Sequence, residues 1–307
     1  MGWTAGDIPD QQGKVVLVTG SNSGLGLSSA RALAAAGARV LLACRNEQKA
    51  AEALVVVREA AQGAEPEVVA LDLADLTSVR ACAQDVAGRV DHLDVVMNNA
   101  GIMAIPKSQT AQGFEAQFGT NHLGHFALDG LLLPLLAAAP SPRVVTTTSF
   151  MHRMGTMHWD DLSAERGYRK WLAYGQSKLS NLLFAYELDR LSRAQGSTLV
   201  SVAAHPGYAS THLQAAGPEM AGNRVAGHVM SVSNAIAAQP ADMGALPQLY
   251  GATMPDVKGG DFYGPGGLFE MRGSPRKVRA ARAASDPTSA KRLWTLSEQM
   301  TGVTYEW

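Results

Sequence analysis

Short, almost wholly apolar runs alternate along most of the chain with longer segments whose apolar residues recur at helical spacing. The apolar runs predict strands over residues 14–19, 39–43, 67–71, 94–97, 143–148 and 198–203. The segments between them predict helices over residues 25–36, 47–62, 75–86, 113–138 and 171–193. Because strands that are buried on both faces lack polar alternation, the pattern indicates a parallel sheet between layers of helices.

Right-handed crossovers between such strands produce a doubly wound sheet. We therefore expect one domain over the whole chain of 307 residues, an α/β fold with a Rossmann-type doubly wound parallel sheet flanked by helices. Residues 208–240, helical in tendency but interrupted by glycines, predict a small substrate lid. Residues 259–307 predict a C-terminal extension, in which Asp286 and Pro287 start a helix and Gly302 ends it.

Composition narrows the classes of function. Apolar residues make up 46% of the chain and charged residues 17%, which suits a large core and not a disordered chain. The net charge of -1 gives no basic excess for nucleic acid, and the basic run at 276–282 is interpreted as a solvated face. The apolar stretch 126–139 is too short for a membrane span. With only Cys44 and Cys82, and no apolar signal segment in residues 1–14, the sequence favours a reducing cytoplasm.

A glycine-rich turn joins the first predicted strand to the first predicted helix. Gly20 permits a tight turn, Gly24 lets backbone amides approach a pyrophosphate, and Gly26 lets helix and strand pack closely. The helix N-terminus adds unpaired N–H groups for the anion. A purely structural turn would contain similar glycines, but the position between strand and helix favours a dinucleotide site. The residues expected to contact the cofactor here are Gly20, Ser21, Asn22, Ser23, Gly24, Leu25 and Gly26.

The end of the second predicted strand distinguishes NAD from NADP. An NAD enzyme usually carries Asp or Glu there, which accepts a hydrogen bond from the ribose 2′-hydroxyl. Here the neutral Cys44 occupies that place, and the guanidinium of Arg45 beside it suits a 2′-phosphate. The alternative is that Arg45 is an ordinary surface arginine. The sequence therefore favours NADP(H) as the preferred cofactor and leaves NAD(H) open.

Tyr174 and Lys178 are four residues apart, on one face of a predicted helix. A free tyrosine has a pKa of about 10, and a nearby lysine cation is expected to lower it. Ser149, at the end of the fifth predicted strand, adds a hydroxyl that can hold a substrate carbonyl oxygen beside Tyr174. Tyrosine and lysine also occur at this spacing by chance on surface helices, so the pair alone is weak support for catalysis.

In chain order, these motifs resemble those of the short-chain dehydrogenases/reductases. The matching features are the turn at 19–26, Asn98-Asn99-Ala100-Gly101, Asn121, Ser149, Tyr174-xxx-Lys178 and Pro206-Gly207. Further segments are similar to the retinol-dehydrogenase and WW-domain-oxidoreductase branch, namely residues 43–46, 120–126 and 262–265. The resemblance covers nearly the whole chain and implies an NADP(H)-dependent oxidoreductase that interconverts a carbonyl and an alcohol.

The resemblance also implies a role for each matching residue. Tyr174 would be the general acid in reduction and the base in oxidation, Lys178 would tune Tyr174 and bind the nicotinamide ribose, and Ser149 would orient the substrate oxygen. Asn121 would hold a water of a proton relay, and no metal is implied. The other implied cofactor contacts are Asp72 and Leu73 for adenine, Asn99, Ala100 and Gly101 for the adenosine ribose, and Pro206, Gly207 and Thr211 for nicotinamide.

Several of these residues have simpler explanations. Asp72 and Thr211 could serve only as caps, and the Asn-Asn pair after the fourth strand could only close a turn. His122 and His125 are expected to be packing histidines without a catalytic role. His205, at the active end of the sixth predicted strand, is also interpreted as structural.

The sequence leaves the substrate open. Methionines in residues 150–173 and 208–240, which are expected to cover the crevice, suit a lipophilic ketone, aldehyde or alcohol, although helix packing explains them equally well. The main alternative function is a non-catalytic NADP-binding sensor or interaction protein on the same fold, and the complete catalytic set argues against it. The spacing of the glycines and the modest tail disfavour a nucleotide-sugar epimerase or dehydratase. Pairing into a homodimer or homotetramer stays open.

Overall fold

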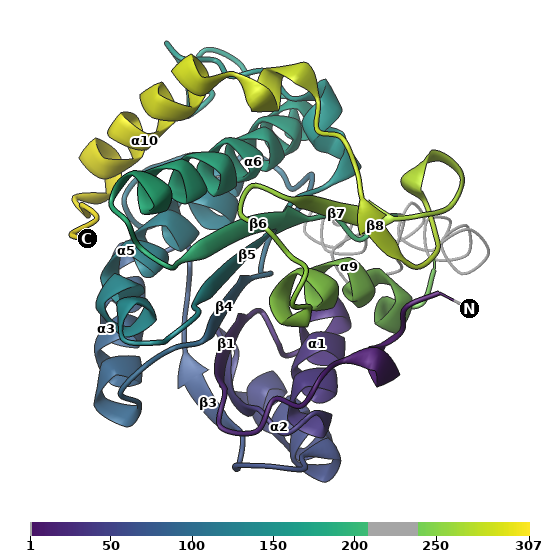
Figure 1. The fold of residues 1–307 in the computed structure, drawn as a ribbon. Coiled ribbons are helices and arrows are strands. Elements are labelled where there is room, and N and C mark those ends of the chain that lie inside the picture. Colours follow the sequence, from purple (N-terminus) through teal and green to yellow (C-terminus); the bar gives the residue numbers. More distant parts are fainter. Residues whose placement is uncertain (1, 208–238) are drawn as a thin grey trace, which may run out of the picture.

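The computed structural model describes residues 2–207 and 239–307, which form one sheet with helices on both faces (Figure 1). The strands are β1 (Val15–Thr19), β2 (Arg39–Cys44), β3 (Glu67–Ala70), β4 (Val95–Asn98), β5 (Arg143–Thr147), β6 (Val200–Ala204), β7 (Phe262–Pro265) and β8 (Pro275–Lys277). Their order across the sheet is β3-β2-β1-β4-β5-β6-β7-β8. All neighbouring pairs of these described strands are parallel except β7 and β8, which are antiparallel. The expected doubly wound α/β fold is confirmed.

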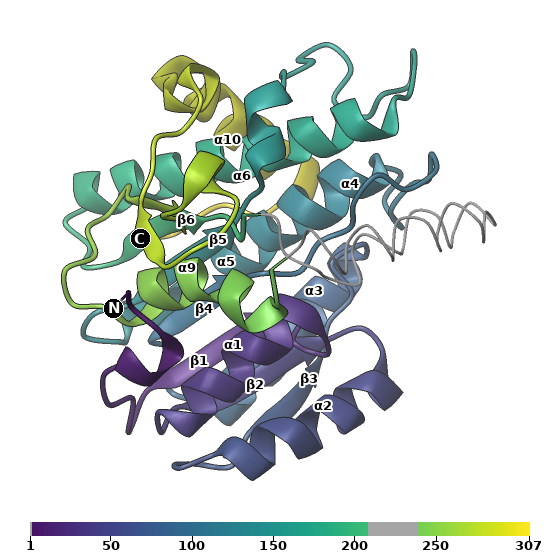
Figure 2. The ribbon, with the colours of Figure 1, turned by 90° about the vertical axis from the view of Figure 1, so that its right-hand side faces the viewer.

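Two layers of helices bury the sheet (Figures 1 and 2). The helices are α1 (Gly24–Ala35), α2 (Glu47–Ala60), α3 (Leu76–Arg89), α4 (Ala116–Phe118), α5 (Gly124–Ala137), α6 (Lys170–Ala194), α9 (Ala241–Thr253) and α10 (Pro287–Thr301). Val16 and Val18 of β1 share a core with α1, α2 and α9. Leu17 of β1 points to the opposite core, with α3, α5 and α6. β1 is therefore apolar from its first residue to Val18, because both of its faces are covered.

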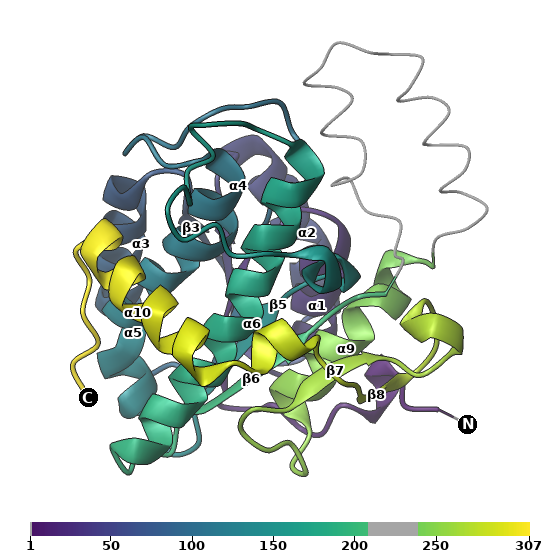
Figure 3. The same cartoon turned by 90° about the horizontal axis from the view of Figure 1, so that it is seen from above.

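The C-terminal helix α10 packs across α6 and also contacts α5 (Figure 3). Asp286 caps its start by accepting from two first-turn amides at 3.1 and 3.2 Å, and Gly302 ends it with a φ of 63°. The Trp294 ring lies 5.0 Å from that of Phe126 and 5.9 Å from that of Phe184, measured between centroids. The predicted C-terminal helix and its two end signals are confirmed.

The helix predicted over residues 113–138 begins later than expected. Gly113 has a φ of 85°, in the left-handed region, and therefore lies in a turn before the helix. Glu115 marks the actual start, because its carboxylate accepts from the backbone amides two and three residues further on, at 2.9 and 2.7 Å. The helix then continues from α4 through a π-helical segment, Gly119–Leu123, into α5.

The sequence pattern does not predict β7 and β8. β7 contains a glycine and a proline and pairs with β6 over only two residues, so it lacks the long apolar run that marks a buried strand. The lid predicted over residues 208–240 lies outside the described residues except for Gln239 and Pro240, and Thr211 also lies outside them. Of the helices that the structure describes, none is long and apolar enough to cross a membrane.

A buried carboxyl group holds the end of β4 against α5. Asp129 of α5 is 1% exposed, and its Oδ2 accepts a hydrogen bond from the side-chain amide of Asn98, the last residue of β4, at 2.5 Å. Burial raises the pKa of Asp129 to about 8, so the carboxyl group is mostly protonated at neutral pH. A neutral acid beside an amide is less costly in this position than a buried carboxylate.

We predict that Asp129→Asn changes how stability depends on pH. The native carboxyl group stays protonated up to about pH 8, whereas the unfolded chain ionises it above a pKa of 3.8. Between these values the unfolded state binds fewer protons, so the free energy of unfolding of the wild type falls as pH rises, by up to about 1.4 kcal/mol per pH unit. Asp129→Asn removes this loss, and the stability difference between the two proteins should grow with pH.

Denaturant unfolding at about pH 5 and about pH 8 measures this difference. The control is Asp91→Asn, which changes an exposed carboxylate. A stability difference between wild type and Asp129→Asn that is equal at both pH values would contradict the protonated state of Asp129.

Candidate active site

The carboxyl ends of four neighbouring strands bring the predicted site residues together. β1, β4, β5 and β6 are adjacent and parallel. Parallel strands end at the same edge of a sheet, which is where doubly wound sheets bind ligands. The segments that follow these strands, and so share this edge, are residues 20–26, 99–101, 148–154 and 205–207.

The glycine turn has the backbone conformation that its sequence predicts. Gly20 and Gly24 have φ values of 65° and 53°, in the left-handed region. A Cβ on Gly26 would lie 2.3 Å from the carbonyl oxygen of Gly20 and 2.5 Å from the side-chain nitrogen of Asn99, so α1 packs directly on the turn. No side chain of the described residues caps α1 at Ser23. The first-turn amides therefore keep their donors for an anion.

The hydroxyl of Thr19 joins the ends of β1 and β4. It accepts hydrogen bonds from the backbone amides of Asn99 and Ala100, both at 3.0 Å, and its oxygen lies 2.9 Å from Nε2 of His125. The other ring nitrogen of His125 donates to the carbonyl oxygen of Asn121 at 3.0 Å. Burial lowers the pKa of His125 to about 4, so the ring is neutral. The ring thus links the start of the glycine turn to the helix that carries Asn121.

Gln248 of α9 also reaches the turn, although the sequence analysis does not select it. Its Nε2 donates to the Ser29 hydroxyl at 2.7 Å and to Oδ1 of Asn99 at 3.2 Å. Its Oε1 accepts from the Thr147 hydroxyl at 2.7 Å. The side chain is buried and connects α1, β4 and β5. The one signal in the sequence is a lone amide among the apolar residues of α9.

Arg45 lies at the end of β2, where a 2′-phosphate would be expected. Its side chain is 71% exposed, and its guanidinium is 3.9 Å from the carboxylate of Asp72. The Cys44 sulfur is 3.4 Å from the hydroxyl of Ser21, which places the end of β2 beside the glycine turn. Asp72 also closes a turn, because its Oδ1 accepts from the Ala74 amide at 2.9 Å. The end of β2 therefore offers a cation and a neutral thiol and has no carboxylate of its own.

Tyr174 and Lys178 are buried, at 4% and 3% exposure, and are not a chance pair on a surface helix. Burial raises the pKa of Tyr174 to about 12, and a hydrogen bond with the Ser149 side chain opposes this rise. The predicted lowering of the Tyr174 pKa is therefore wrong for the protein on its own. The reason is the burial of the phenol itself. Burial also lowers the pKa of Lys178, to about 8, and its Nζ donates to the Thr147 carbonyl oxygen at 3.2 Å.

Asn121 lies within the π-helical segment, a type of irregularity that often marks functional sites. Its Nδ2 donates to the hydroxyl of Ser177 and to the carbonyl oxygen of Ile102, both at 2.9 Å, and its Oδ1 accepts from the Ile102 amide at 2.8 Å. A Cβ on Gly101 would be 3.0 Å from this Oδ1 and 3.4 Å from Nζ of Lys178. Glycine thus lets the segment after β4 pass close to Lys178.

Leu73 has a different surrounding from the other predicted cofactor contacts. It is buried, and a Cβ on Gly124 of α5 would lie 2.5 Å from its carbonyl oxygen. The segment after β3 therefore packs directly against α5. This contact alone explains the burial of Leu73, and its predicted place beside adenine stays a prediction.

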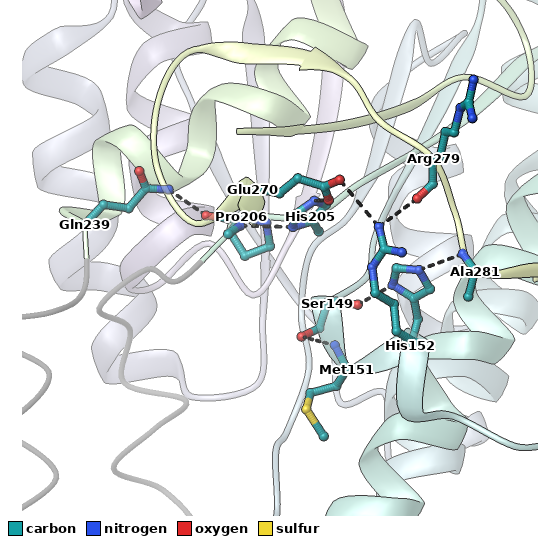
Figure 4. Close-up of polar contacts among 11 residues, drawn as sticks. Ser149, Met151, His152, His205, Pro206, Gln239, Glu270, Arg279 and Ala281 are labelled. Atoms are coloured by element: carbon teal, nitrogen blue, oxygen red, sulfur yellow. Dashed lines mark hydrogen bonds and ion pairs between the residues drawn. The ribbon is translucent and has the colours of Figure 1, made fainter. Parts of the chain in front are cut away.

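Ser149 and Pro206 lie on two separate segments that border the site (Figure 4). The Ser149 hydroxyl caps the short helix Phe150–Met154 by accepting from the Met151 amide at 3.3 Å. The carbonyl oxygen of Pro206 accepts from the side-chain amide of Gln239 at 2.6 Å. The next residue, Gly207, has a φ of 66°. A hydrogen bond within the segment thus holds Ser149, and one from a residue 33 positions further along the chain holds Pro206.

Known proteins are similar to this chain in sequence and in fold. A family model described as short chain dehydrogenase matches residues 14–222. Retinol dehydrogenase 14 of Mus musculus is 38% identical over 311 residues, covering 97% of this chain and 89% of that protein. A crystal structure of an uncharacterized protein from Mycobacterium Paratuberculosis has a TM-score of 0.82 and 42% identity, with 100% of both chains covered. A short chain dehydrogenase from Shigella flexneri, complexed with NADP, has a TM-score of 0.63 and 25% identity, with 82% of this chain and 96% of the other covered.

We predict that Gly26→Ala destabilises the fold by about 1–3 kcal/mol, because the added carbon would overlap the Gly20 carbonyl group. The matched control is Gly88→Ala in α3. An added Cβ there meets no heavy atom within 4 Å in the structure as described, and alanine favours a helix by up to about 1 kcal/mol. Denaturant unfolding of the three proteins compares them. Equal free energies of unfolding for the two variants would contradict the close contact between α1 and the turn.

Proposed function

This chain belongs to the short-chain dehydrogenase/reductase family and is an NAD(P)-dependent oxidoreductase, and we propose that it interconverts a carbonyl compound and its alcohol with NADP(H). The observation that carries the proposal is the buried pair Tyr174 and Lys178, with the half-buried Ser149 hydrogen-bonded to Tyr174. A non-catalytic sensor of NADP, the alternative, would not need a desolvated lysine next to a buried phenol.

The protein's own groups fit a bound dinucleotide. The left-handed glycines of the turn and the uncapped start of α1 suit a pyrophosphate. When bound in its reduced form, the nicotinamide supplies a hydride to the carbonyl carbon. We propose that the residues in contact with the cofactor are Gly20, Ser21, Asn22, Ser23, Gly24, Leu25, Gly26, Arg45, Asp72, Leu73, Asn99, Ala100, Gly101, Tyr174, Lys178, Pro206 and Gly207.

Tyr174 is the general acid of the reduction. Its raised pKa keeps the phenol protonated at neutral pH, so it can donate its proton to the carbonyl oxygen of the substrate. The Ser149 hydroxyl, hydrogen-bonded to Tyr174, holds the same oxygen. The phenolate left on Tyr174 is stabilised by the ammonium group of Lys178, whose Nζ is 5.8 Å from the centre of the phenol ring. In alcohol oxidation the phenolate form of Tyr174, stabilised by Lys178, accepts the proton of the alcohol and becomes the phenol.

Asn121 supports proton return to this pair. Ser177 and Ile102 take both hydrogens of its side-chain amide, so a water can only be held by an oxygen acceptor of Asn121, and its backbone carbonyl oxygen is one. His125 occupies one lone pair of that oxygen, and a carbonyl oxygen has two. We propose that the second lone pair holds the water through which Lys178 regains its proton.

A preference for NADP(H) is supported by the end of β2. Cys44 is neutral, because burial raises the pKa of its thiol, and Arg45 is exposed to a ligand. A 2′-phosphate there would meet a guanidinium, whereas an NAD enzyme would offer a carboxylate to the 2′-hydroxyl. The Shigella flexneri relative complexed with NADP is consistent with this preference.

The proposed substrate is a lipophilic ketone, aldehyde or alcohol, such as a retinoid, a steroid or an alkyl compound. Three exposed apolar side chains lie close in sequence to Ser149 and Tyr174: Phe150, Met154 and Trp171 are 48%, 61% and 43% exposed. The similarity to retinol dehydrogenase 14 supports the same class. We also propose a cytoplasmic location, which the sequence favours. We further propose that the chain pairs into a homodimer or homotetramer, a question that the sequence leaves open.

We predict that the purified protein consumes NADPH with lipophilic aldehydes or ketones, and that Tyr174→Phe lowers kcat by about 10²–10⁴-fold. The variant keeps the ring and its burial but loses the transferable proton. Absorbance of NADPH measures turnover, and fluorescence titration measures NADPH binding, which the variant should retain within about threefold.

The panel of substrates should vary chain length and ring size, so that the ranking describes the pocket. NADPH binding without turnover of any substrate, unchanged in Tyr174→Phe, would favour the sensor over the enzyme. Turnover that survives in the variant would remove Tyr174 from the reaction.

We further predict that Arg45→Ala weakens NADPH binding about tenfold and changes NADH binding by less than about twofold, because only NADPH carries the 2′-phosphate. Fluorescence titration with both cofactors measures this. Arg58→Ala is the control, since it removes an exposed arginine of α2 that pairs with Glu65. Tighter binding of NADH than of NADPH by the wild type would overturn the preference.

A further inference from the structure

The carboxylate of Glu270 links the two segments that border the site (Figure 4). Glu270 lies in the loop between β7 and β8, outside every motif of the sequence analysis, and its side chain is 17% exposed. One oxygen, Oε2, is 3.0 Å from Nε2 of His205, which follows β6. The other oxygen, Oε1, is 3.4 Å from the guanidinium of Arg153, in the helix that Ser149 caps.

The contacts of His205 define its tautomer. Its Nδ1 accepts a hydrogen bond from the backbone amide of Gly207 at 3.2 Å, so this nitrogen carries no proton. The ring proton is therefore on Nε2 and is donated to Glu270. This hydrogen bond is the main cause that lowers the pKa of Glu270, so the carboxyl group is ionised. A charged acceptor thus fixes the one ring form that can hold the Gly207 amide.

Two glycines give this arrangement the space it needs. A Cβ on Gly264 of β7 would lie 2.1 Å from Nε2 of His205, so only glycine lets the ring lie across the strand. A Cβ on Gly207 would lie 2.5 Å from the carbonyl oxygen of Met271 and 2.9 Å from that of Glu270. The loop between β7 and β8 therefore presses its backbone against the turn after β6.

Arg153 forms the second arm. Its guanidinium donates to the carbonyl oxygen of Arg279 at 2.9 Å as well as pairing with Glu270. The neighbouring His152 donates from Nδ1 to the Ser149 carbonyl oxygen at 2.6 Å and accepts from the Ala281 amide at 3.2 Å. Burial lowers the pKa of His152 to about 4, so the ring is neutral and can accept. Hydrogen bonds with residues that follow β8 thus hold the segment that carries Ser149.

Apolar packing does not explain the position of the loop. Leu268 and Phe269 are 80% and 74% exposed, so the loop buries little apolar surface of its own. Phe269 and Glu270 have φ values of 52° and 58°, a conformation that costs a non-glycine residue about 1 kcal/mol or more and persists only where contacts enforce it. The polar contacts of Glu270 bind this loop to the segments that border the site.

We propose that Glu270 is a positioning residue that holds the Pro206–Gly207 turn through His205 and the Ser149 segment through Arg153. We call this set of three side chains the Glu270 clamp. The His205 arm acts on the side where the nicotinamide is proposed to bind, and the Arg153 arm acts on the side of the substrate oxygen. The roles of the two sides rest on the proposed function. The contacts of Glu270 are seen in the structure and do not depend on that function.

The two arms predict that variants change NADPH affinity and the substrate KM separately, which a merely structural loop would not produce. Glu270→Ala should weaken NADPH binding and raise the KM for the carbonyl substrate, each by about tenfold, because both arms are lost. Glu270→Gln keeps an acceptor for Nε2 of His205 and should restore NADPH binding to within about threefold of wild type. Arg153→Ala should raise the substrate KM by about fivefold or more and leave NADPH binding within about twofold.

The matched control is Glu65→Ala, which removes an exposed ion pair, 2.8 Å long, between Glu65 in the segment after α2 and Arg58 of α2. Fluorescence titration gives NADPH affinity, initial rates give KM and kcat, and circular dichroism gives the folded fraction. A readout that needs no cofactor is NMR of ¹⁵N-labelled histidines in the full chain. We expect His205 of the wild type to be the Nε2–H tautomer, and expect a mixture of tautomers in Glu270→Ala.

The Glu270 clamp is overturned if Glu270→Ala binds NADPH and substrate like Glu65→Ala, or if Glu270→Ala and Arg153→Ala give the same changes. It is also overturned if His205 keeps one tautomer in Glu270→Ala. Failure of the wild type to bind NADPH or to turn over a carbonyl would instead refute the proposed function. In that case the histidine tautomer still tests the clamp.

Discussion

The buried hydroxyl of Thr19 is the contact on which the arrangement of the site depends. Thr19 is the last residue of β1. Its hydroxyl accepts hydrogen bonds from the backbone amides of the two residues that follow β4, and it contacts the ring of His125 on α5. Each of these buried polar groups would cost about 1–3 kcal/mol if it were left without a partner. Because the ring of His125 also holds the carbonyl of Asn121, one hydroxyl sets the spacing between the glycine turn and the helix beside it. The edge of the sheet is therefore in place before a ligand arrives, which reduces the ordering that binding requires.

Burial at this edge moves most titrating groups toward their neutral forms. The pKa of Asp129 rises to about 8 and that of Tyr174 to about 12, while that of His125 falls to about 4. Lys178 is the exception that matters for chemistry, because its pKa falls only to about 8 and its ammonium form still dominates at neutral pH. Because Asp129 and His125 are neutral, the ammonium group of Lys178 acts in a region of low polarity, and a negative charge that develops on the Tyr174 oxygen is stabilised more strongly there than in water.

The sequence predicts those parts of the structure that depend on local chemistry. The left-handed backbone of Gly20 and Gly24 is predictable because that conformation selects glycine. The start of α10 is predictable because Asp286 caps the helix that directly follows it. The parts that it does not predict depend on contacts between distant segments. Gln248 reaches Asn99 across 149 positions of the chain, and β7 pairs with β6 over too few residues to leave an apolar pattern. The pKa of Tyr174 belongs to the same class, since burial depends on the whole fold.

The segment that matches the family model ends at residue 222, yet the chain beyond it supplies several contacts that hold the site. Gln248 supports the turn beside α1, and Glu270 and the Ala281 amide support the segments that follow β6 and β5. The proposed reacting groups all precede this boundary, so the chemistry and its support are encoded in different parts of the chain. Leu268 and Phe269 of the loop are exposed, so these residues can change without disturbing Tyr174 or Lys178. Selectivity for a substrate can therefore diverge in the C-terminal extension while the proton transfer stays the same.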